Sequence, residues 1–314
     1  MTESLTNAAT VLLIFLIGYT FKKFNLCDIS FARKLSYVIM YVTLPCAILS
    51  GSQGGLEMEY SLFFIVPIAF VISFCFPLIG YFLYKRDPKF CVYSMLNLGG
   101  FNIGNFILPF MQSTLSTEGF LALCLFDVVN AFFCFGGVYC MALYFNQKGF
   151  DSGKPVNLKM VALELSKSVT SYCCILCIVF SSLNITIPSI IMHPVKVMGS
   201  SNTFICMFVI GIALNFNMTF NQISRIIKMI FLRYSAALVS ALLIAFLLPY
   251  SPMVKLILIA IVFAPITSLA PITAIRSLPQ FAEDSANLNM MSVIISVVLI
   301  TAICAFSPAL MSIL

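Results

Sequence analysis

The chain has 314 residues, of which 61% are hydrophobic and 9% are charged, and its mean hydropathy is +1.07. A soluble domain carries roughly 25% charged residues, and one soluble core cannot bury so much apolar side chain. This excludes a soluble protein, and we expect a chain embedded almost entirely in a bilayer. The formal net charge of +6 does not indicate a nucleic-acid partner, because the basic residues separate the apolar runs and form no patch.

Ten apolar runs are candidates for membrane-spanning helices, since a span needs about 20 mostly apolar residues. The first run, near residues 8–19, lacks the basic region and the small-residue cleavage site of a signal peptide, so we expect it to be the first span. The predicted spans are 6–24, 34–52, 60–84, 90–112, 118–145, 164–185, 198–217, 229–249, 253–277 and 288–312.

The distribution of Lys and Arg predicts the orientation of these spans. If the N-terminus is outside, only Lys196 and Lys255 of the 17 basic residues fall in outer connections, which leaves 17 − 2 = 15 for the inner ones. This asymmetry obeys the positive-inside rule, and an odd number of spans would destroy it. We therefore expect both termini outside and the polar loop 146–157 in the cytoplasm, in a plasma or inner membrane.

The polar loop divides the spans into two sets of five, and an odd number per set inverts the second set relative to the first. Asn25–Ser30 resembles Asn184–Ser189 in sequence, which gives an offset of 184 − 25 = 159 residues between the halves. Inverted repeats are a common transporter architecture. The predicted organisation is a first five-helix repeat at 1–147, a cytoplasmic linker at 148–158 and an inverted repeat at 159–314.

The fourth and ninth predicted spans contain helix breakers. Proline removes a backbone donor, so Pro109 is expected to free the carbonyl of Asn105, and Pro271 that of Thr267. An ordinary proline kink explains one such helix, but two in corresponding positions favour a transporter binding site. The convergent ends of the half-helices would favour an anion. The expected substrate contacts are Asn102, Gly104, Asn105, Pro109, Pro265, Thr267, Ser268 and Pro271.

Charged and polar side chains also lie within the fifth and eighth predicted spans. Asp127 and Asn130 share one helical face in the fifth span, and a carboxylate at this depth should face the protein interior. A proton or cation coupling site and a structural hydrogen bond are both open for this pair. Arg233 lies near the start of the eighth span, where we expect it to extend to the inner headgroups.

The segment Asn102-x-Gly104-x-x-x-x-Pro109 resembles the Asn-Gly-Pro signature of the auxin efflux carrier family of membrane transporters. Pro45 in the second span and the ending Asp284…Val293-Ile-Ile-Ser296 are similar to that family as well. The resemblance covers nearly the whole chain, with a departure at Ile107, where the family pattern has glycine. It implies a fold with two broken, crossing helices, a scaffold of the first, second, sixth and seventh spans, and a moving core. The implied substrates are small organic anions such as auxin, malate or malonate.

Other classes of protein fit the sequence less well. The twelve cysteines, with a cluster at Cys173, Cys174 and Cys177, and the single His193 lack the paired spacings of a zinc site, so we expect packing and no metal. No Ser-His-Asp, HExxH or Walker pattern is present, so we expect neither an enzyme nor a cofactor. A secondary carrier with alternating access is the leading hypothesis. A channel or passive facilitator is the first alternative, and a cation-coupled symporter of the bile-acid type is the second. Proton or sodium coupling and a homodimeric state stay open.

Overall fold

The computed structural model describes residues 2–51, 60–112, 115–150, 169–183, 185, 187–213 and 220–314. Within these ranges the regular structure is helical, and an isolated antiparallel bridge between Phe101 and Ile266 is the one β-type pairing. The predicted all-α fold class is therefore confirmed. Most of the predicted linker 148–158 lies outside the described residues, because residues 151–168 are not described.

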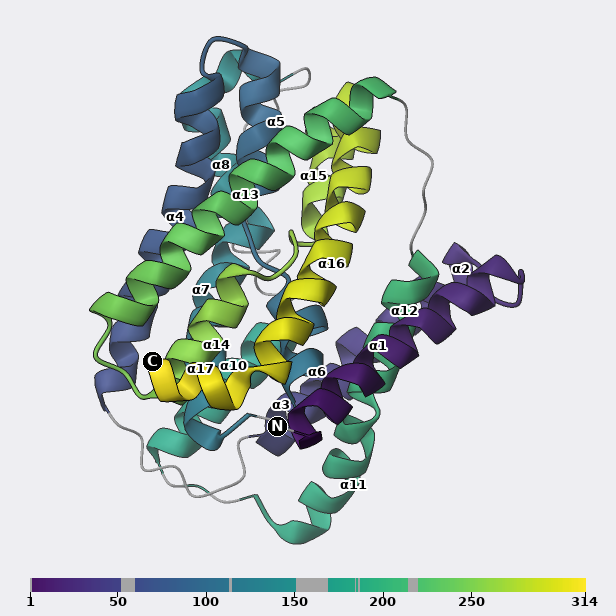
Figure 1. The fold of residues 1–314 in the computed structure, drawn as a ribbon, viewed down its shortest axis with the longest axis vertical. Coiled ribbons are helices and arrows are strands. Elements are labelled where there is room, and N and C mark those ends of the chain that lie inside the picture. The colour runs from purple at the N-terminus through teal and green to yellow at the C-terminus, as the bar shows by residue number, and fades with distance from the viewer. Residues whose placement is uncertain are drawn as a thin grey trace.

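Figure 1 shows the helices in chain order. The α-helices are α1 (Thr2–Lys23), α2 (Ile29–Val38), α3 (Leu44–Gly51), α4 (Ile65–Tyr84), α5 (Pro88–Leu98), α6 (Leu108–Met111), α7 (Thr117–Phe132), α8 (Val138–Asn146), α10 (Val169–Ser182), α11 (Ser189–Ser200), α12 (Asn202–Ala213), α13 (Phe220–Leu247), α14 (Pro252–Val262), α15 (Leu269–Ser277), α16 (Ala282–Ala305) and α17 (Ser307–Ile313). One π-helical turn, Ile39–Thr43, joins α2 to α3, and another, Phe133–Gly137, joins α7 to α8 across a kink at Gly136. A third, Ile103–Ile107, leads directly into α6. Short 3₁₀ turns lie at Tyr60–Phe64, Gln147–Gly149 and Pro279–Phe281.

Six continuous helical segments of the described chain are long and apolar enough to cross a bilayer. These segments are Ile29–Gly51, Ser61–Tyr84, Thr117–Gly149, Ser189–Ala213, Gln222–Leu247 and Pro279–Ala305. One boundary differs from the prediction in a way that affects the site, because α13 begins at Phe220 and not near 229. Polar residues such as Asn221 and Gln222 lower the local hydropathy without ending the helix.

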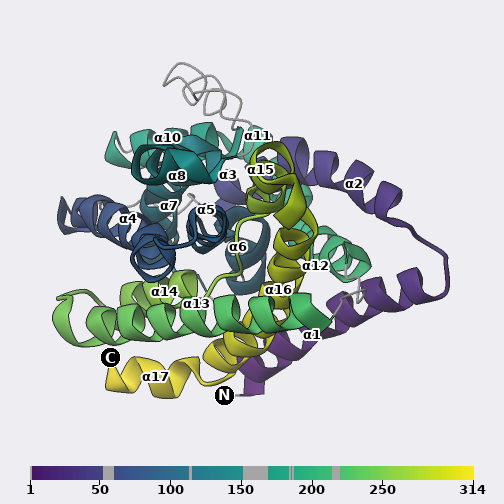
Figure 2. The ribbon, with the colours of Figure 1, turned by 90° about the horizontal axis from the view of Figure 1, so that it is seen from above.

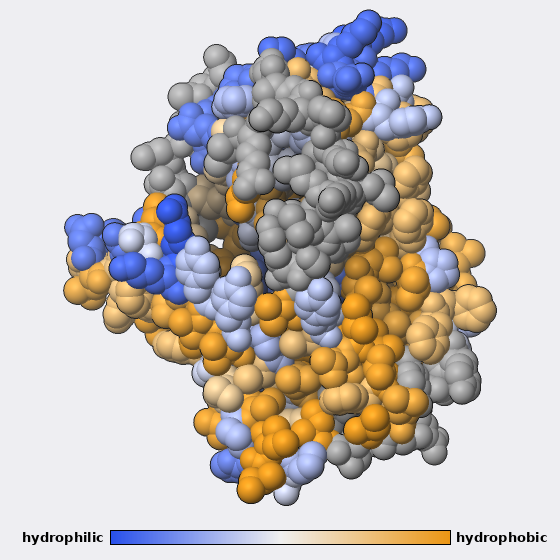
Figure 3. Space-filling view, turned by 180° about the vertical axis from the view of Figure 1, so that it is seen from behind, coloured by the Kyte–Doolittle hydropathy of each residue, from blue (hydrophilic) through white to orange (hydrophobic). Residues whose placement is uncertain are grey.

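The surface of the molecule is apolar over much of its height. Figure 3 shows a broad hydrophobic area on one face, with hydrophilic residues gathered toward the ends of the molecule. Large apolar side chains such as Phe231, Phe246 and Ile190 are 75%, 84% and 83% exposed. Such a surface is costly in water and favourable against lipid tails, so it is that of an integral membrane protein.

Six helices form what we call the side group, namely α1, α2, α3, α10, α11 and α12. Within it, α1 and α2 pack against α12, and α10 and α11 pack against α3. The backbones of α1 and α12 approach closely at two glycines. A Cβ atom at Gly18 would lie 2.3 Å from the carbonyl oxygen of Phe208, and one at Gly211 would lie 2.2 Å from that of Phe15. Small residues permit such close packing of helices in a membrane.

The remaining long helices, α4 to α8 and α13 to α16, form what we call the crossing group. Here α4 packs against α5 and α7, α13 packs against α14 and α16, and α7 packs against α14. The two groups meet where α10 contacts α7, α1 contacts α16 and α12 contacts α6. Figure 2 shows α1, α2 and α12 on the opposite side of the molecule from α4.

Candidate functional site

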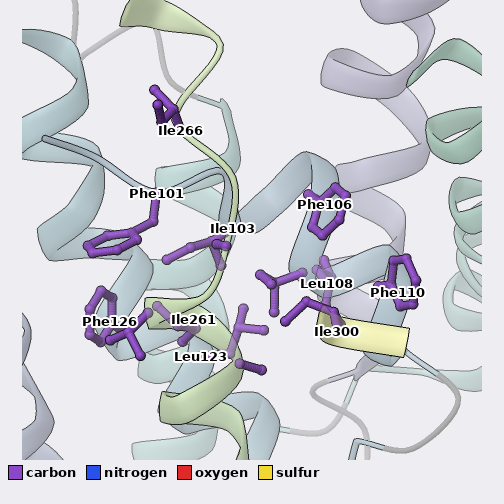
Figure 4. Close-up of a cluster of buried hydrophobic side chains, with 14 of the residues drawn as sticks. Phe101, Ile103, Phe106, Leu108, Phe110, Leu123, Phe126, Ile261, Ile266 and Ile300 are labelled. Atoms are coloured by element: carbon purple, nitrogen blue, oxygen red, sulfur yellow. The ribbon is translucent and has the colours of Figure 1, made fainter. Parts of the chain in front are cut away.

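Helices α5 and α14 both stop in the middle of the molecule. Each has 11 residues and begins at a proline that follows a capping side chain, Asp87 for α5 and Ser251 for α14. After Leu98 and Val262 the chain is non-helical for a few residues before the next helical turn begins. Figure 4 shows these two non-helical segments crossing, with Phe101 on one and Ile266 on the other.

A short antiparallel contact holds the two segments together. Phe101 and Ile266 form the isolated bridge, and the backbone N–H of Asn102 donates to the carbonyl of Pro265 at 3.0 Å. On the side-chain level, Asn102 Nδ2 donates to Ser268 Oγ at 3.3 Å. The two broken spans predicted from the prolines are therefore present, and they meet at their breaks.

The positions of the breaks differ from those predicted from Pro109 and Pro271. Pro109 lies near the end of the continuous helical segment 103–111, which begins after the first break. Pro271 lies near the start of α15, where a missing backbone N–H costs little. The carbonyl of Thr267 accepts from the Ala270 N–H at 3.1 Å and from Asn289 Nδ2 at 3.2 Å, so Pro271 does not leave it free. The breaks are instead made by Gly99 to Asn102 and by Phe263 to Thr267.

Gly100 is the residue that allows the first break. Its φ of +81° lies in the left-handed region, which residues other than glycine rarely adopt. A Cβ atom at this position would lie 2.7 Å from Cys134 Sγ and 2.8 Å from Thr267 Cγ2. Glycine is therefore required both by the backbone conformation and by the closeness of the second broken segment.

Helix α7 holds the first break through Asn130. The Oδ1 atom of Asn130 accepts from the Phe101 N–H at 2.8 Å, and its Nδ2 atom donates to the Phe101 carbonyl at 2.8 Å. The same Nδ2 donates to Asp127 Oδ1 at 3.1 Å. Asp127 is buried, and Asn130 lies between its carboxylate and the broken segment at Phe101.

Helix α16 holds the second break in a matching way. Asn289 Nδ2 donates to the carbonyl of Ile266 at 2.8 Å, and Ser292 Oγ accepts from the Ile266 N–H at 3.1 Å. Ser296 Oγ donates to the carbonyl of Phe263 at 2.7 Å. The backbone of Ile266 thus receives from α16 the two hydrogen bonds that the backbone of Phe101 receives from α7.

Arg233 of α13 joins both breaks. Its guanidinium donates to the carbonyls of Leu98 at 2.8 Å, Gly100 at 3.2 Å, Ala264 at 3.1 Å and Pro265 at 3.4 Å. The Cζ atom of the guanidinium also lies 4.9 Å from the centre of the Phe101 ring. The side chain is completely buried, so the expected extension to the headgroups was wrong. Because α13 begins at position 220, Arg233 lies 13 residues, about 20 Å, along the helix.

A cavity of about 270 Å³ lies between the crossing and the side group. Its wall on the crossing group carries the polar side chains of Asn102, Asn105, Ser268 and Asn289. Its wall on the side group is mainly apolar. Besides these four residues, the lining consists of Ser36, Ile39, Met40, Cys206, Val209, Ile210, Ala213, Ala286, Met290 and Val293. None of the lining residues that the structure describes is an Asp, Glu, Lys, Arg or His.

Asn105 differs from the other amides of the site. Among the described residues it makes no side-chain hydrogen bond, whereas Asn102, Asn130 and Asn289 each make at least one. Its amide therefore faces the cavity with its donors and acceptor available for a ligand.

Comparison with known protein families agrees with this architecture. The model of the membrane transport protein family matches residues 4–304. The chain belongs to that family. The family includes carriers of the auxin-efflux type, so the resemblance seen in the sequence is confirmed at the level of the family. No curated protein matches the chain significantly. A membrane transport protein is not an enzyme, and its many apolar helices make it an integral membrane protein.

The residues predicted from the sequence fall in three places. Asn102, Asn105 and Ser268 line the cavity of this transport protein, and Asp127 and Asn130 lie behind the first break. The other predicted contacts belong to the broken segments or the turns that follow them without lining the cavity, namely Gly104, Pro109, Pro265, Thr267 and Pro271.

Two residues of the site were not predicted in their present roles. Asn289 holds the second break, and the internal offset points to it, since 130 + 159 = 289 places it opposite Asn130. Arg233 has no comparable signal, because a basic residue near the start of an apolar run is typical of a membrane interface.

Proposed function

We propose that this protein is a secondary carrier that moves a small organic anion across the membrane by alternating access. The observation that carries the proposal is the cavity between the two helix groups, with polar side chains on the crossing and apolar side chains opposite. Since each group supplies one wall, a movement of one group against the other would open this cavity first to one side of the membrane and then to the other.

An inverted repeat supports the alternating-access mechanism. Helices α5 and α14 match in length and capping, and the contacts of α1 with α12 resemble those of α10 with α3. Thr43 Oγ1 donates to Asn202 Oδ1 at 3.0 Å, and these two positions are related by the offset of 159. Residues at equivalent positions touch each other only near a twofold axis. We therefore retain the division into repeats at 1–147 and 159–314, with ten spans and with both termini outside.

The chemistry of the cavity favours a carboxylate with an apolar body. Asn102 and Ser268 stand at the starts of the helical segments that follow the breaks, and helix starts favour negative charge. The amide of Asn105 adds donors for carboxylate oxygens. The side-group wall offers mainly apolar side chains to the rest of the ligand. Auxin fits this description better than the dicarboxylates malate and malonate, which carry a second charge.

We place the coupling site at Asp127 and Asn130. Asp127 accepts a hydrogen bond from the same Asn130 nitrogen that holds the Phe101 carbonyl. If the carboxylate gained a proton, its hydrogen bond with Asn130 would weaken. The hydrogen bonds that Asn130 makes to the backbone of the first break would change as a result. A buried carboxylate in a membrane protein is commonly functional for this reason.

The experiment that tests the proposal is uptake into proteoliposomes. Radiolabelled indole-3-acetate, malate and malonate are offered with and without proton and sodium gradients. A carrier shows saturable uptake and accelerated exchange when unlabelled substrate is inside the vesicles, and empty liposomes are the control. Uptake that never saturates and shows no exchange would favour a channel, the second candidate. Strict sodium dependence would favour the bile-acid type of symporter.

A further inference from the structure

The guanidinium of Arg233 lies where the carbonyl ends of two helices converge. Helix α5 ends at Leu98 and helix α14 at Val262, and each C-terminal end carries a partial negative charge. Arg233 donates to the carbonyl of Leu98, the last residue of α5, and to three carbonyls of the breaks that follow the two helices, those of Gly100, Ala264 and Pro265. One fixed positive charge thus neutralises both ends.

No carboxylate in the described part of the chain pairs with Arg233. Among the described residues, the one ion pair joins Arg225 to Asp284 near the starts of α13 and α16. The carboxylate behind the first break, Asp127, accepts a hydrogen bond from Asn130 and not from Arg233. The Arg233 Nε atom has no hydrogen-bond partner in the described part of the chain. The surroundings of the guanidinium are therefore backbone carbonyls and the rings of Phe76 and Phe101.

Backbone carbonyls at the ends of broken helices are the groups that bind alkali cations in many transporters. Here the four carbonyls face an arginine instead. We propose that Arg233 is a permanent internal cation that takes the place of a sodium ion at the crossing, so that the carrier binds its anion without sodium. This rests on the proposed carrier function and adds to it the residue that determines independence from sodium.

The alternative is that Arg233 acts only through its hydrogen bonds, as a tether between the two breaks. A pair of substitutions separates charge from hydrogen bonding. Arg233→Lys keeps the positive charge with fewer donors, and Arg233→Gln keeps an amide donor without the charge. Lys228→Gln is the matched control, because Lys228 lies on the same helix with an exposed side chain.

The first measurement is exchange of radiolabelled indole-3-acetate and of malonate in proteoliposomes, in sodium or in choline chloride. We expect the wild type and Lys228→Gln to work equally in both salts. Arg233→Lys should stay within about tenfold of wild type, and Arg233→Gln should fall at least about tenfold further, because a charged hydrogen bond is lost in a buried place. Equal activity of the Lys and Gln variants would mean that hydrogen bonds alone suffice, and would overturn the proposal.

The second measurement is thermal stability, which needs no substrate. Arg233→Ala leaves the four carbonyls without a cation, so sodium or millimolar methylguanidinium should raise its Tm relative to choline, while the Tm of the wild type should not respond. Failure of both ions to stabilise Arg233→Ala would contradict the proposal. If that variant does not fold, folding of Arg233→Lys but not of Arg233→Gln supports the proposal, and failure of both contradicts it.

The outcomes distinguish this inference from the carrier function. Sodium-dependent exchange by the wild type would refute the internal cation and leave the carrier intact. Absence of any uptake by the wild type would refute the carrier, and the stability measurement would still decide whether Arg233 replaces a cation.

Discussion

At the scale of single residues, the site depends on polar side chains that satisfy backbone groups in a place without water. Unpaired backbone groups are costly inside a membrane, so irregular segments persist there only with protein partners. Asn130 supplies both partners for Phe101, and Asn289 and Ser292 supply them for Ile266. Asn105 is left with its amide facing the cavity. The amides of the site therefore divide into those that hold the break and one that is free to bind.

This division predicts different effects for two asparagine substitutions. Asn105→Ala should weaken apparent substrate affinity by about ten- to a hundredfold, the loss of a hydrogen bond to a charged ligand, with little change in Tm. Asn289→Ala should lower the Tm, because the carbonyl of Ile266 loses its partner. Binding isotherms and thermal unfolding measure the two effects, with the exposed Val298→Ala as control. Normal affinity of Asn105→Ala would place the substrate elsewhere.

Asp127 tests the coupling proposal at the same scale. Asp127→Asn cannot gain or lose a proton, so gradient-driven uptake should fall to the level of empty liposomes, while exchange at equal pH on both sides continues. A purely structural role would instead lower stability and both activities together. Gradient-driven uptake at the normal rate by a stable Asn variant would exclude Asp127 as the coupling group.

At the scale of elements, the residues at the ends of the broken helices determine where each helix starts and stops, and the prolines alone do not. A capping side chain and a proline start α5 and α14, and both helices stop after 11 residues. Gly100 then turns the chain with a positive φ, and Pro265 occupies the second break, where its carbonyl accepts from the Asn102 N–H. The crossing therefore needs one residue that has no side chain.

Gly100→Ala should be among the most damaging small substitutions in the protein. The added methyl meets Cys134 and Thr267, and the backbone is strained as well, which together cost about 2–5 kcal/mol. We expect a markedly lower Tm and loss of uptake. Gly119→Ala is a matched control, since its Cβ would meet flexible side chains at 3.2 Å in the first turn of α7. Equal stability of the two variants would show that the first break tolerates another geometry.

At the scale of the whole molecule, two helix groups meet along a limited interface that includes the cavity. The contacts between them are those of α7 with α10, α16 with α1 and α6 with α12. Two buried thiols lie in the first of these contacts, where Cys124 of α7 and Cys174 of α10 interact with each other. A covalent link between these residues would join the crossing group to the side group.

Such a link should stop transport if the groups move against each other. Oxidation by membrane-permeant diamide, which is itself reduced as the two thiols form a disulfide, should abolish exchange, and dithiothreitol should restore it. Mass spectrometry measures the extent of the 124–174 disulfide. Cys124→Ser should be insensitive to diamide, with Cys75→Ser, an exposed thiol, as control. Full exchange by the fully cross-linked protein would contradict movement at this contact.

The membrane environment, the helical fold class and the presence of two broken helices could be predicted from the sequence. Composition and the length of the apolar runs predict the membrane environment and the helical class, because both properties depend only on local side-chain chemistry. Asn102, Asn105 and Ser268 could be predicted as cavity residues because polar residues beside helix breakers are conspicuous in an apolar chain. The role of Asn289 was not predicted, although the offset of 159 residues relates it to Asn130.

The positions of the breaks, and the partners of their backbone groups, depend on how the helices pack in three dimensions. Proline indicates a missing donor, but the neighbouring helices determine whether the freed carbonyl finds a partner, as Asn289 does for Thr267. Arg233 is the clearest case, because its partners are more than 130 positions away at Leu98 and Gly100 and more than 30 positions away at Ala264 and Pro265. No local sequence pattern indicates these hydrogen bonds, since they form only once α5, α13 and α14 have packed together.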